Sequence, residues 1–241
     1  MKRRFYDLHL RTEPNKTKQL VAKAAKFGYH AISIPVTKEL PADQLAELKA
    51  VCTENGLDFV TRADFKPRNQ EDLKRFLRIY RRKFEVIAII CDNKDVARQA
   101  AKDRRVDILN FPSLDFHKRF FDRAEAELAS CSLAALEVDV KSLLLLEGPP
   151  RVRLLANIRR EVAIAREFHV PIVLSSGISE EYSMRTPRDL ASLAYLFGLS
   201  EMKALDAVSA VPAAMVTRNR EKLSTKFVAP GITLVRESKQ T

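Results

Sequence analysis

The chain has 241 residues, of which 46% are hydrophobic and 30% are charged. This balance is typical of a globular protein and excludes the polar, aromatic-poor composition of a disordered chain. Lysine and arginine number 42 against 31 aspartates and glutamates, which gives a formal net charge of +11. Such an excess attracts polyanions, so the composition favours a nucleic acid as the partner.

The sequence also predicts the cellular compartment of the protein. No run approaches the roughly 18 consecutive apolar residues of a membrane-spanning helix, and the first residues lack the apolar region of a secretory signal. The three cysteines form no CxxC pair, which argues against a disulfide framework or a zinc knuckle. We therefore expect a cytoplasmic protein with reduced thiols and no membrane contact.

Along the chain, short β-branched runs alternate with helical patterns, which predicts βα units and a mainly parallel sheet. The helical patterns include Asn69–Lys83 and Val152–Phe168, each with one apolar face. The segment Glu147–Arg151, between the predicted strand Leu133–Val140 and the helix Val152–Phe168, is expected to be a loop. The predicted strands are Phe5–Leu10, Ala31–Val36, Leu57–Arg62, Val86–Cys91, Val106–Phe111, Leu133–Val140, Pro171–Ser175, Ala207–Val211 and Ile232–Val235.

Eight or more mostly parallel strands predict a TIM-barrel-like α/β fold. Barrels of this kind reach about 250 residues as one domain, so we expect residues 1–236 to form a single domain. The polar segment 237–241 is expected to be a frayed tail.

In a βα barrel, functional side chains come from the carboxyl ends of the strands. Asp7 and His9 lie two residues apart on the first strand, so their side chains point the same way. The sequence Asp-Leu-His-Leu resembles the opening metal motif of histidinol-phosphatase-like phosphoesterases, but Arg11 replaces its second histidine. A metal-dependent phosphoesterase is therefore one alternative. Its candidate residues are Asp7, His9, Asp64, His117 and Asp139.

The basic residues are better organised than this metal motif. The helix Asn69–Lys83 carries most of its arginines and lysines away from its apolar stripe, and arginine binds phosphate well. Any one cluster could instead be a solvated face balanced by carboxylates. We expect contacts with RNA phosphates rather than base stacking. The candidate RNA-binding residues are Arg62, Arg68, Arg82, Arg104, Arg105, Arg119, Arg185, Arg188, Arg218 and Arg220.

Arg185 is the most specific of these candidates. It follows a polar loop at a strand end and directly precedes Thr186 and Pro187, which predict the N-cap and first residue of a helix. Such a position suits phosphate oxygens. The alternative is that Arg185 pairs with Glu180 or Glu181.

Seven segments spread over nearly the whole chain carry a resemblance to a known family. In order, they are Phe5–His9, Gly28–Ile32, Ser176–Gly177, Met184–Leu190, Leu196–Leu199, Ala204–Ser209 and Arg218–Leu223. With this ordered set, the sequence resembles the archaeal ribonuclease P protein component 3 family, although Ile178 departs from the smaller residue expected after Ser-Gly.

This resemblance implies a barrel related to the histidinol-phosphatase-like group but without its metal centre. It also implies a protein subunit of the RNA enzyme that removes the 5′ leader of precursor tRNA. The catalytic RNA would hold the magnesium ions and cleave, while this chain would bind no cofactor and supply no catalytic residue. Ribonuclease P protein component 2 and further subunits would be its protein partners. A stand-alone RNA-binding chaperone is a further alternative.

Overall fold

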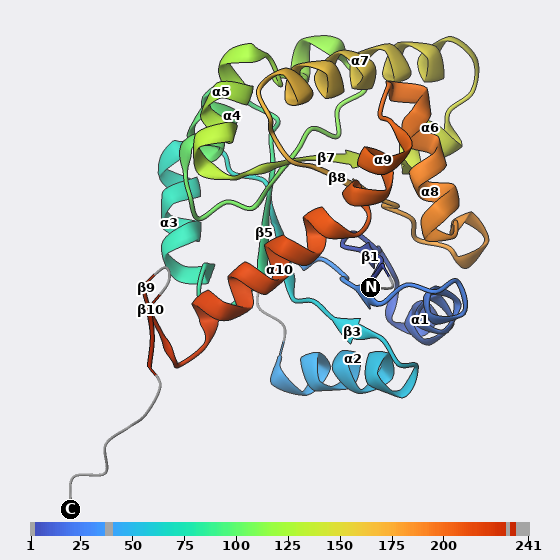
Figure 1. The fold of residues 1–241 in the computed structure, drawn as a ribbon, viewed down its shortest axis with the longest axis vertical. Coiled ribbons are helices and arrows are strands. Elements are labelled where there is room, and N and C mark those ends of the chain that lie inside the picture. Colours follow the sequence, from blue (N-terminus) through green and yellow to red (C-terminus); the bar gives the residue numbers. More distant parts are fainter. Residues whose placement is uncertain (1–2, 37–40, 230–231, 235–241) are drawn as a thin grey trace, which may run out of the picture.

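The structure is a computed structural model that describes residues 3–36, 41–229 and 232–234. Its parallel strands form two sheets in which each strand pairs with the next along the chain, β1 to β3 in one and β4 to β8 in the other. Helices surround these strands (Figure 1). The strands are β1 (Tyr6–Asp7), β2 (Ala31–Ile32), β3 (Asp58–Phe59), β4 (Arg62–Phe65), β5 (Val86–Ile90), β6 (Ile108–Asn110), β7 (Ala135–Asp139) and β8 (Ile172–Ser175).

Backbone contacts connect the two sheets at both edges. A parallel bridge between Val36 and Ala63 joins the β2 side to β4. On the other side, Gly177 N donates to His9 O and Arg11 N donates to Ile178 O, each at 2.8 Å. These bonds link the chain after β8 to the chain after β1, and the fold is TIM-barrel-like, as predicted.

The helices cover the outside of the sheets, and their sequences explain their ends. Asn69 and Thr186 cap the amino termini of α3 and α8 by accepting hydrogen bonds from backbone N–H groups, and Pro187 opens α8 as predicted. The α-helices are α1 (Thr17–Lys26), α2 (Ala42–Glu54), α3 (Gln70–Tyr80), α4 (Lys94–Lys102), α5 (Arg123–Ser132), α6 (Lys141–Leu145), α7 (Gly148–Glu167), α8 (Pro187–Leu193), α9 (Glu201–Ala207) and α10 (Ala210–Leu223), and the 3-10 turns are η1 (Pro14–Lys16), η2 (Phe116–Lys118), η3 (Glu181–Ser183) and η4 (Ala194–Phe197).

Four predicted segments differ in the structure. The single strand predicted at Leu57–Arg62 divides into β3 and β4, which belong to different sheets. Ala207–Val211 is not a strand, because α9 ends and α10 begins there; a short apolar run does not distinguish a strand from a buried helix. Ile232–Thr233 forms β10, which pairs antiparallel with β9 (Phe227–Ala229) outside the parallel sheets. Gly148 already begins α7, since prolines are accepted in a first helical turn.

Helix α10 crosses the amino-terminal end of the strands (Figure 1). Its Met215 and Val216 pack against the inward-facing apolar residues of the strands, among them Val86 and Val173. Asn219 donates from Nδ2 to the Glu85 carbonyl at 2.7 Å. The helix therefore closes one end of the barrel core and leaves the carboxyl end of the strands for polar groups.

The remaining predictions concern the chain ends and the membrane. The predicted tail 237–241 lies outside the described residues, and the single-domain organisation over residues 1–236 stays a prediction. None of the described helices is long and apolar enough to cross a membrane.

Candidate functional site

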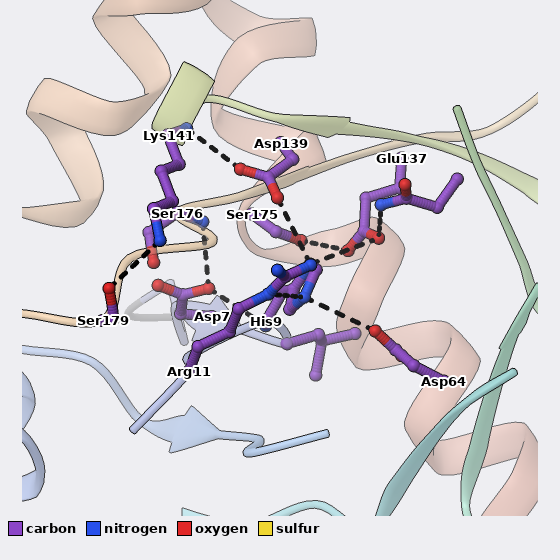
Figure 2. Close-up of polar contacts among 12 residues, drawn as sticks. Asp7, His9, Arg11, Asp64, Glu137, Asp139, Lys141, Ser175, Ser176 and Ser179 are labelled. Atoms are coloured by element: carbon purple, nitrogen blue, oxygen red, sulfur yellow. Dashed lines mark hydrogen bonds and ion pairs between the residues drawn. The ribbon is translucent and has the colours of Figure 1, made fainter. Parts of the chain in front are cut away.

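A buried polar network fills the carboxyl end of the strands (Figure 2). The structure brings together four of the five residues that sequence analysis assigned to a metal site: Asp7, His9, Asp64 and Asp139. The fifth, His117, lies on the exposed turn η2. The strand-end side chains thus do converge, as the fold predicts.

Arg62 is the central cation of this network. Its side chain is fully buried, and Nε donates to Asp64 Oδ1 at 2.6 Å. Its two terminal nitrogens bind both carboxylate oxygens of Glu137 at 2.6 and 2.8 Å. Burial alone would lower the pKa of Arg62, but the two carboxylates hold it above its usual value. Burial excludes this side chain from contact with RNA, which corrects the prediction for Arg62.

Glu137 is a charged network residue that sequence analysis missed. It also accepts hydrogen bonds from Asn110 Nδ2 at 2.6 Å and from Ser175 Oγ at 2.5 Å. Burial would raise the pKa of Glu137, but the attraction of Arg62 and His9 holds it well below the usual range. Period-two spacing could have revealed it, since Glu137 and Asp139 share one face of β7 as Arg62 and Asp64 share one face of β4.

Arg11 occupies the place where the metal motif would have its second histidine. Its Nε donates to His9 Nε2 at 3.0 Å, so this ring nitrogen accepts a hydrogen bond from a guanidinium group. His9 Nδ1 lies 3.6 Å from carboxylate oxygens of both Glu137 and Asp139. A guanidinium group therefore contacts the histidine nitrogen that would otherwise be available to a metal.

Asp7 and Asp139 flank this centre. Asp7 Oδ1 accepts from the backbone N–H groups of His9 and Ser176, each at 3.2 Å, whereas Oδ2 has no hydrogen-bond partner among the described residues. Burial raises the pKa of both carboxyl groups despite these bonds and the nearby His9. Both groups thus favour the neutral, protonated form more than a free aspartate does.

Gly177 completes the site. It has a positive φ of 63°, and a Cβ atom at this position would lie 2.0 Å from Asp139 Oδ1. Only glycine fits here without displacing the Asp139 carboxylate.

The network contains cations of its own, and this bears on metal binding. In the described parts of the chain, no group of three or more histidine, cysteine, aspartate or glutamate side chains has an arrangement suited to a metal ion. Arg62 instead binds the carboxylates of Asp64 and Glu137, and Arg11 bonds to His9. Chemically, the arrangement is centred on these ion pairs, while Asp7 has only backbone N–H groups as hydrogen-bond partners among the described residues.

The other predicted RNA contacts lie on the surface, with one exception. Arg119 is buried and forms a two-fold ion pair with Glu161, at 2.7 and 2.5 Å, which corrects its prediction. Arg185 bonds to the carbonyls of Tyr182 and Met184, and the described residues contain no ion pair between it and Glu180 or Glu181.

The predicted RNA-binding arginines at the surface fall into two groups. The paired group binds carboxylates of its own chain: Arg105 pairs with Asp103, Arg218 with Asp107, and Arg220 with Asp58 and Glu85. The second group has no ion pair in the described residues and consists of Arg68, Arg82, Arg104, Arg185 and Arg188.

The fold and the site together define a class: a TIM-barrel-like α/β protein whose strand-end network pairs carboxylates with arginines. Residues 4–224 match the family described as RNase P subunit p30. The chain belongs to the RNase P subunit p30 family.

Individual relatives agree with this assignment. Ribonuclease P protein component 3 of Methanosarcina barkeri is 31% identical over 224 residues, which cover 91% of each chain. The protein of the same name from Methanococcoides burtonii is 29% identical over 98% of this chain and 96% of its own. A chain in a cryo-EM structure of archaeal ribonuclease P with mature tRNA superposes with a TM-score of 0.84 at 24% identity. That superposition covers 98% of this chain and 100% of the other, and it shows the shared fold.

Proposed function

We propose that this chain is a protein subunit of ribonuclease P that binds the catalytic RNA and supports removal of the 5′ leader from precursor tRNA. The match to the RNase P subunit p30 family over residues 4–224 carries this proposal. Its partners would be the ribonuclease P RNA, precursor tRNA through the complex, and further protein subunits, with component 2 among them.

The strand-end network supports a subunit that supplies no catalytic group. A hydrolytic metal needs carboxylates and imidazoles whose lone pairs are free to bind it. Here Glu137 and Asp64 bind Arg62, while Arg11 donates to His9 Nε2. A metal would have to displace two guanidinium groups. We therefore assign cleavage, and the magnesium that it requires, to the RNA.

The surface supplies the groups that RNA binding needs. The formal charge is +11. The second group of arginines, which consists of Arg68, Arg82, Arg104, Arg185 and Arg188, forms no ion pair with carboxylates of the described residues. Arg68 lines a polar hollow of about 770 Å³ at the start of α3, together with the cations Lys66 and Arg75 and the acidic residues Glu71 and Asp72. Phosphate binding by such arginines releases counterions and stabilises folded RNA.

The test is precursor-tRNA cleavage by the reconstituted cognate enzyme at limiting magnesium. We expect the double variant Arg68→Gln/Arg188→Gln to need more magnesium than the wild type for half-maximal cleavage. The control, Lys16→Gln/Arg123→Gln, removes the same charge from cations that already pair with Glu13 and Glu167. If both double variants behave as the wild type does, these arginines do not contact the RNA.

The phosphoesterase alternative makes a separate prediction. It requires stoichiometric metal in the purified chain and hydrolysis of simple phosphate esters that is lost in His9→Ala. Metal analysis and a phosphatase assay of the chain without RNA would detect both properties.

A further inference from the structure

A groove of about 880 Å³ lies at the amino-terminal ends of β7 and β8, opposite the polar network. Its wall from α10 includes Val211, Ala214 and Met215, and Pro171 and Ile172 line it from the start of β8. The groove is thus mainly apolar. Of the predicted RNA-binding arginines, only Arg218 lines it, and Arg218 is paired with Asp107.

Two strained residues lie at this groove. Leu133 and His169 have φ values of 68° and 56°, and they are the non-glycine residues with positive φ in the described chain. Both line the groove, at the turns that lead into β7 and β8. At the corresponding turns before β2 and β3, the chain has Gly28 and Gly56, which adopt this conformation without strain.

The backbone strain at Leu133 and His169 is not offset by burial of their side chains within the chain. Leu133 leaves 54% of its surface exposed, and His169 is exposed as well. Glycine would be the more stable choice at both turns, yet both carry a large side chain that the fold does not bury. Backbone strain at exposed side chains indicates that those side chains act on something outside the chain.

The rim of the groove is positively charged. The exposed Arg166 donates to the Gly198 carbonyl, and neither it nor the exposed Lys203 forms an ion pair with the described residues. The acidic lining residue Asp206 is already paired with Arg3. An occupant with carboxylates at its edges would therefore complement the rim.

We propose that this groove docks a segment of a protein partner that places apolar side chains against Leu133 and the α10 wall and carboxylates against Arg166 and Lys203. RNA phosphates would match the rim but leave the apolar floor unfilled, so the combination favours protein. The inference rests on the proposed function only for the choice of probe, which is the set of other protein subunits of the cognate ribonuclease P.

The test is calorimetric titration of this chain with each purified subunit in the absence of RNA. The wild type should bind at least one subunit, and Leu133→Gly/His169→Gly should bind it about tenfold more weakly. The same variant should melt at an unchanged or higher temperature, because glycine relieves both strained turns. A merely structural role would move the melting temperature and the affinity down together.

Two further variants sharpen the result. Arg166→Glu/Lys203→Glu should weaken the same binding through the rim. Leu145→Ala, at a leucine on α6 that is 62% exposed against 54% for Leu133, should leave it unchanged. The inference is overturned if the wild type binds none of the subunits, or if both groove variants bind as tightly as the wild type. It is also overturned if they lose affinity for the ribonuclease P RNA and not for protein.

This design separates the inference from the proposed function. A wild-type chain that fails to stimulate precursor-tRNA cleavage contradicts the proposed function. Normal stimulation together with undiminished subunit binding by the groove variants contradicts the groove inference alone.

Discussion

The role of Arg62 depends on whether its side chain points into the barrel or toward solvent. Sequence analysis placed it among surface arginines, because a count of basic residues contains no information about which way each one points. The alternation of side chains between the two faces of a strand does contain this information. Arg62 and Asp64 share the inward face of β4, as Glu137 and Asp139 share that of β7. The same argument applied at the sequence level would have found Glu137.

Removing the Arg62 charge should be costly. Arg62→Met leaves Glu137 buried without its cation, and we expect a loss of about 3–5 kcal/mol in the free energy of unfolding. Chemical denaturation measures it. The double variant Arg62→Met/Glu137→Gln should recover part of the loss, since Glu137 then carries no charge and only Asp64 has lost its cation. A single-variant loss below about 1 kcal/mol would show that the pair is not buried as described.

Gly177 provides a second test at this scale. Gly177→Ala introduces a Cβ atom 2.0 Å from Asp139 Oδ1 at a positive φ, so it should lower the free energy of unfolding by about 2 kcal/mol or more. Gly28→Ala is the matched control, because it has a positive φ but no neighbouring atom within 4 Å. Equal losses in the two variants would show that the Asp139 contact contributes nothing.

Among the elements, the βα order was predictable from hydrophobic periodicity. Seven of the strands β1 to β8 lie within predicted segments, because β-branched runs bounded by helices have few alternatives. The exception is β4, because the single strand predicted at Leu57–Arg62 divides into β3 and β4, which belong to different sheets. The junction of α9 and α10 was not predictable in this way. Its apolar residues are needed for α10 to close the barrel core, a tertiary role that a local pattern does not reveal.

The packing of α5 against α4 makes a pH-dependent prediction. Burial raises the pKa of Glu125 to about 7, although Arg98 lies 2.8 Å from its carboxylate and opposes the shift. The native state therefore keeps a proton that the unfolded state releases near pH 4.5. Stability from this group is present at low pH and is lost as the pH rises towards 7 and above, by up to about 3 kcal/mol.

Glu125→Gln should remove that dependence. Its free energy of unfolding should exceed that of the wild type at pH 8 and approach the wild-type value at pH 4, as measured by urea denaturation across this range. Glu127→Gln, an exposed change on the same helix, should follow the wild type at every pH. A constant difference between Glu125→Gln and the wild type would contradict the raised pKa.

At the scale of the whole molecule, the net charge of +11 conceals two populations of arginine. Some hold the fold together, as Arg218 and Arg220 hold α10 against Asp107 and Asp58, and the rest face solvent. Composition predicted a nucleic acid as the partner, because the excess of basic residues remains after the ion pairs within the chain have formed. It could not say which arginines contribute, since that depends on carboxylates brought close only by folding.

RNA binding should reflect this division. The affinity of the chain for ribonuclease P RNA should fall with rising salt, and Arg68→Gln should reduce the slope of log affinity against log salt by about 0.7–0.9. Arg123→Gln, whose charge is shared with Glu167, should leave the slope nearly unchanged. Filter binding across a salt series distinguishes them, and identical slopes would argue against Arg68 as a phosphate contact.

The most direct test of the account is precursor-tRNA cleavage at low magnesium by the cognate ribonuclease P RNA, with and without this chain and its partner subunits. The account predicts that the chain increases cleavage only when the RNA is present, and that His9→Ala retains this effect as long as the variant is folded. Cleavage of precursor tRNA by the protein without the RNA, or no increase with it, would contradict the account.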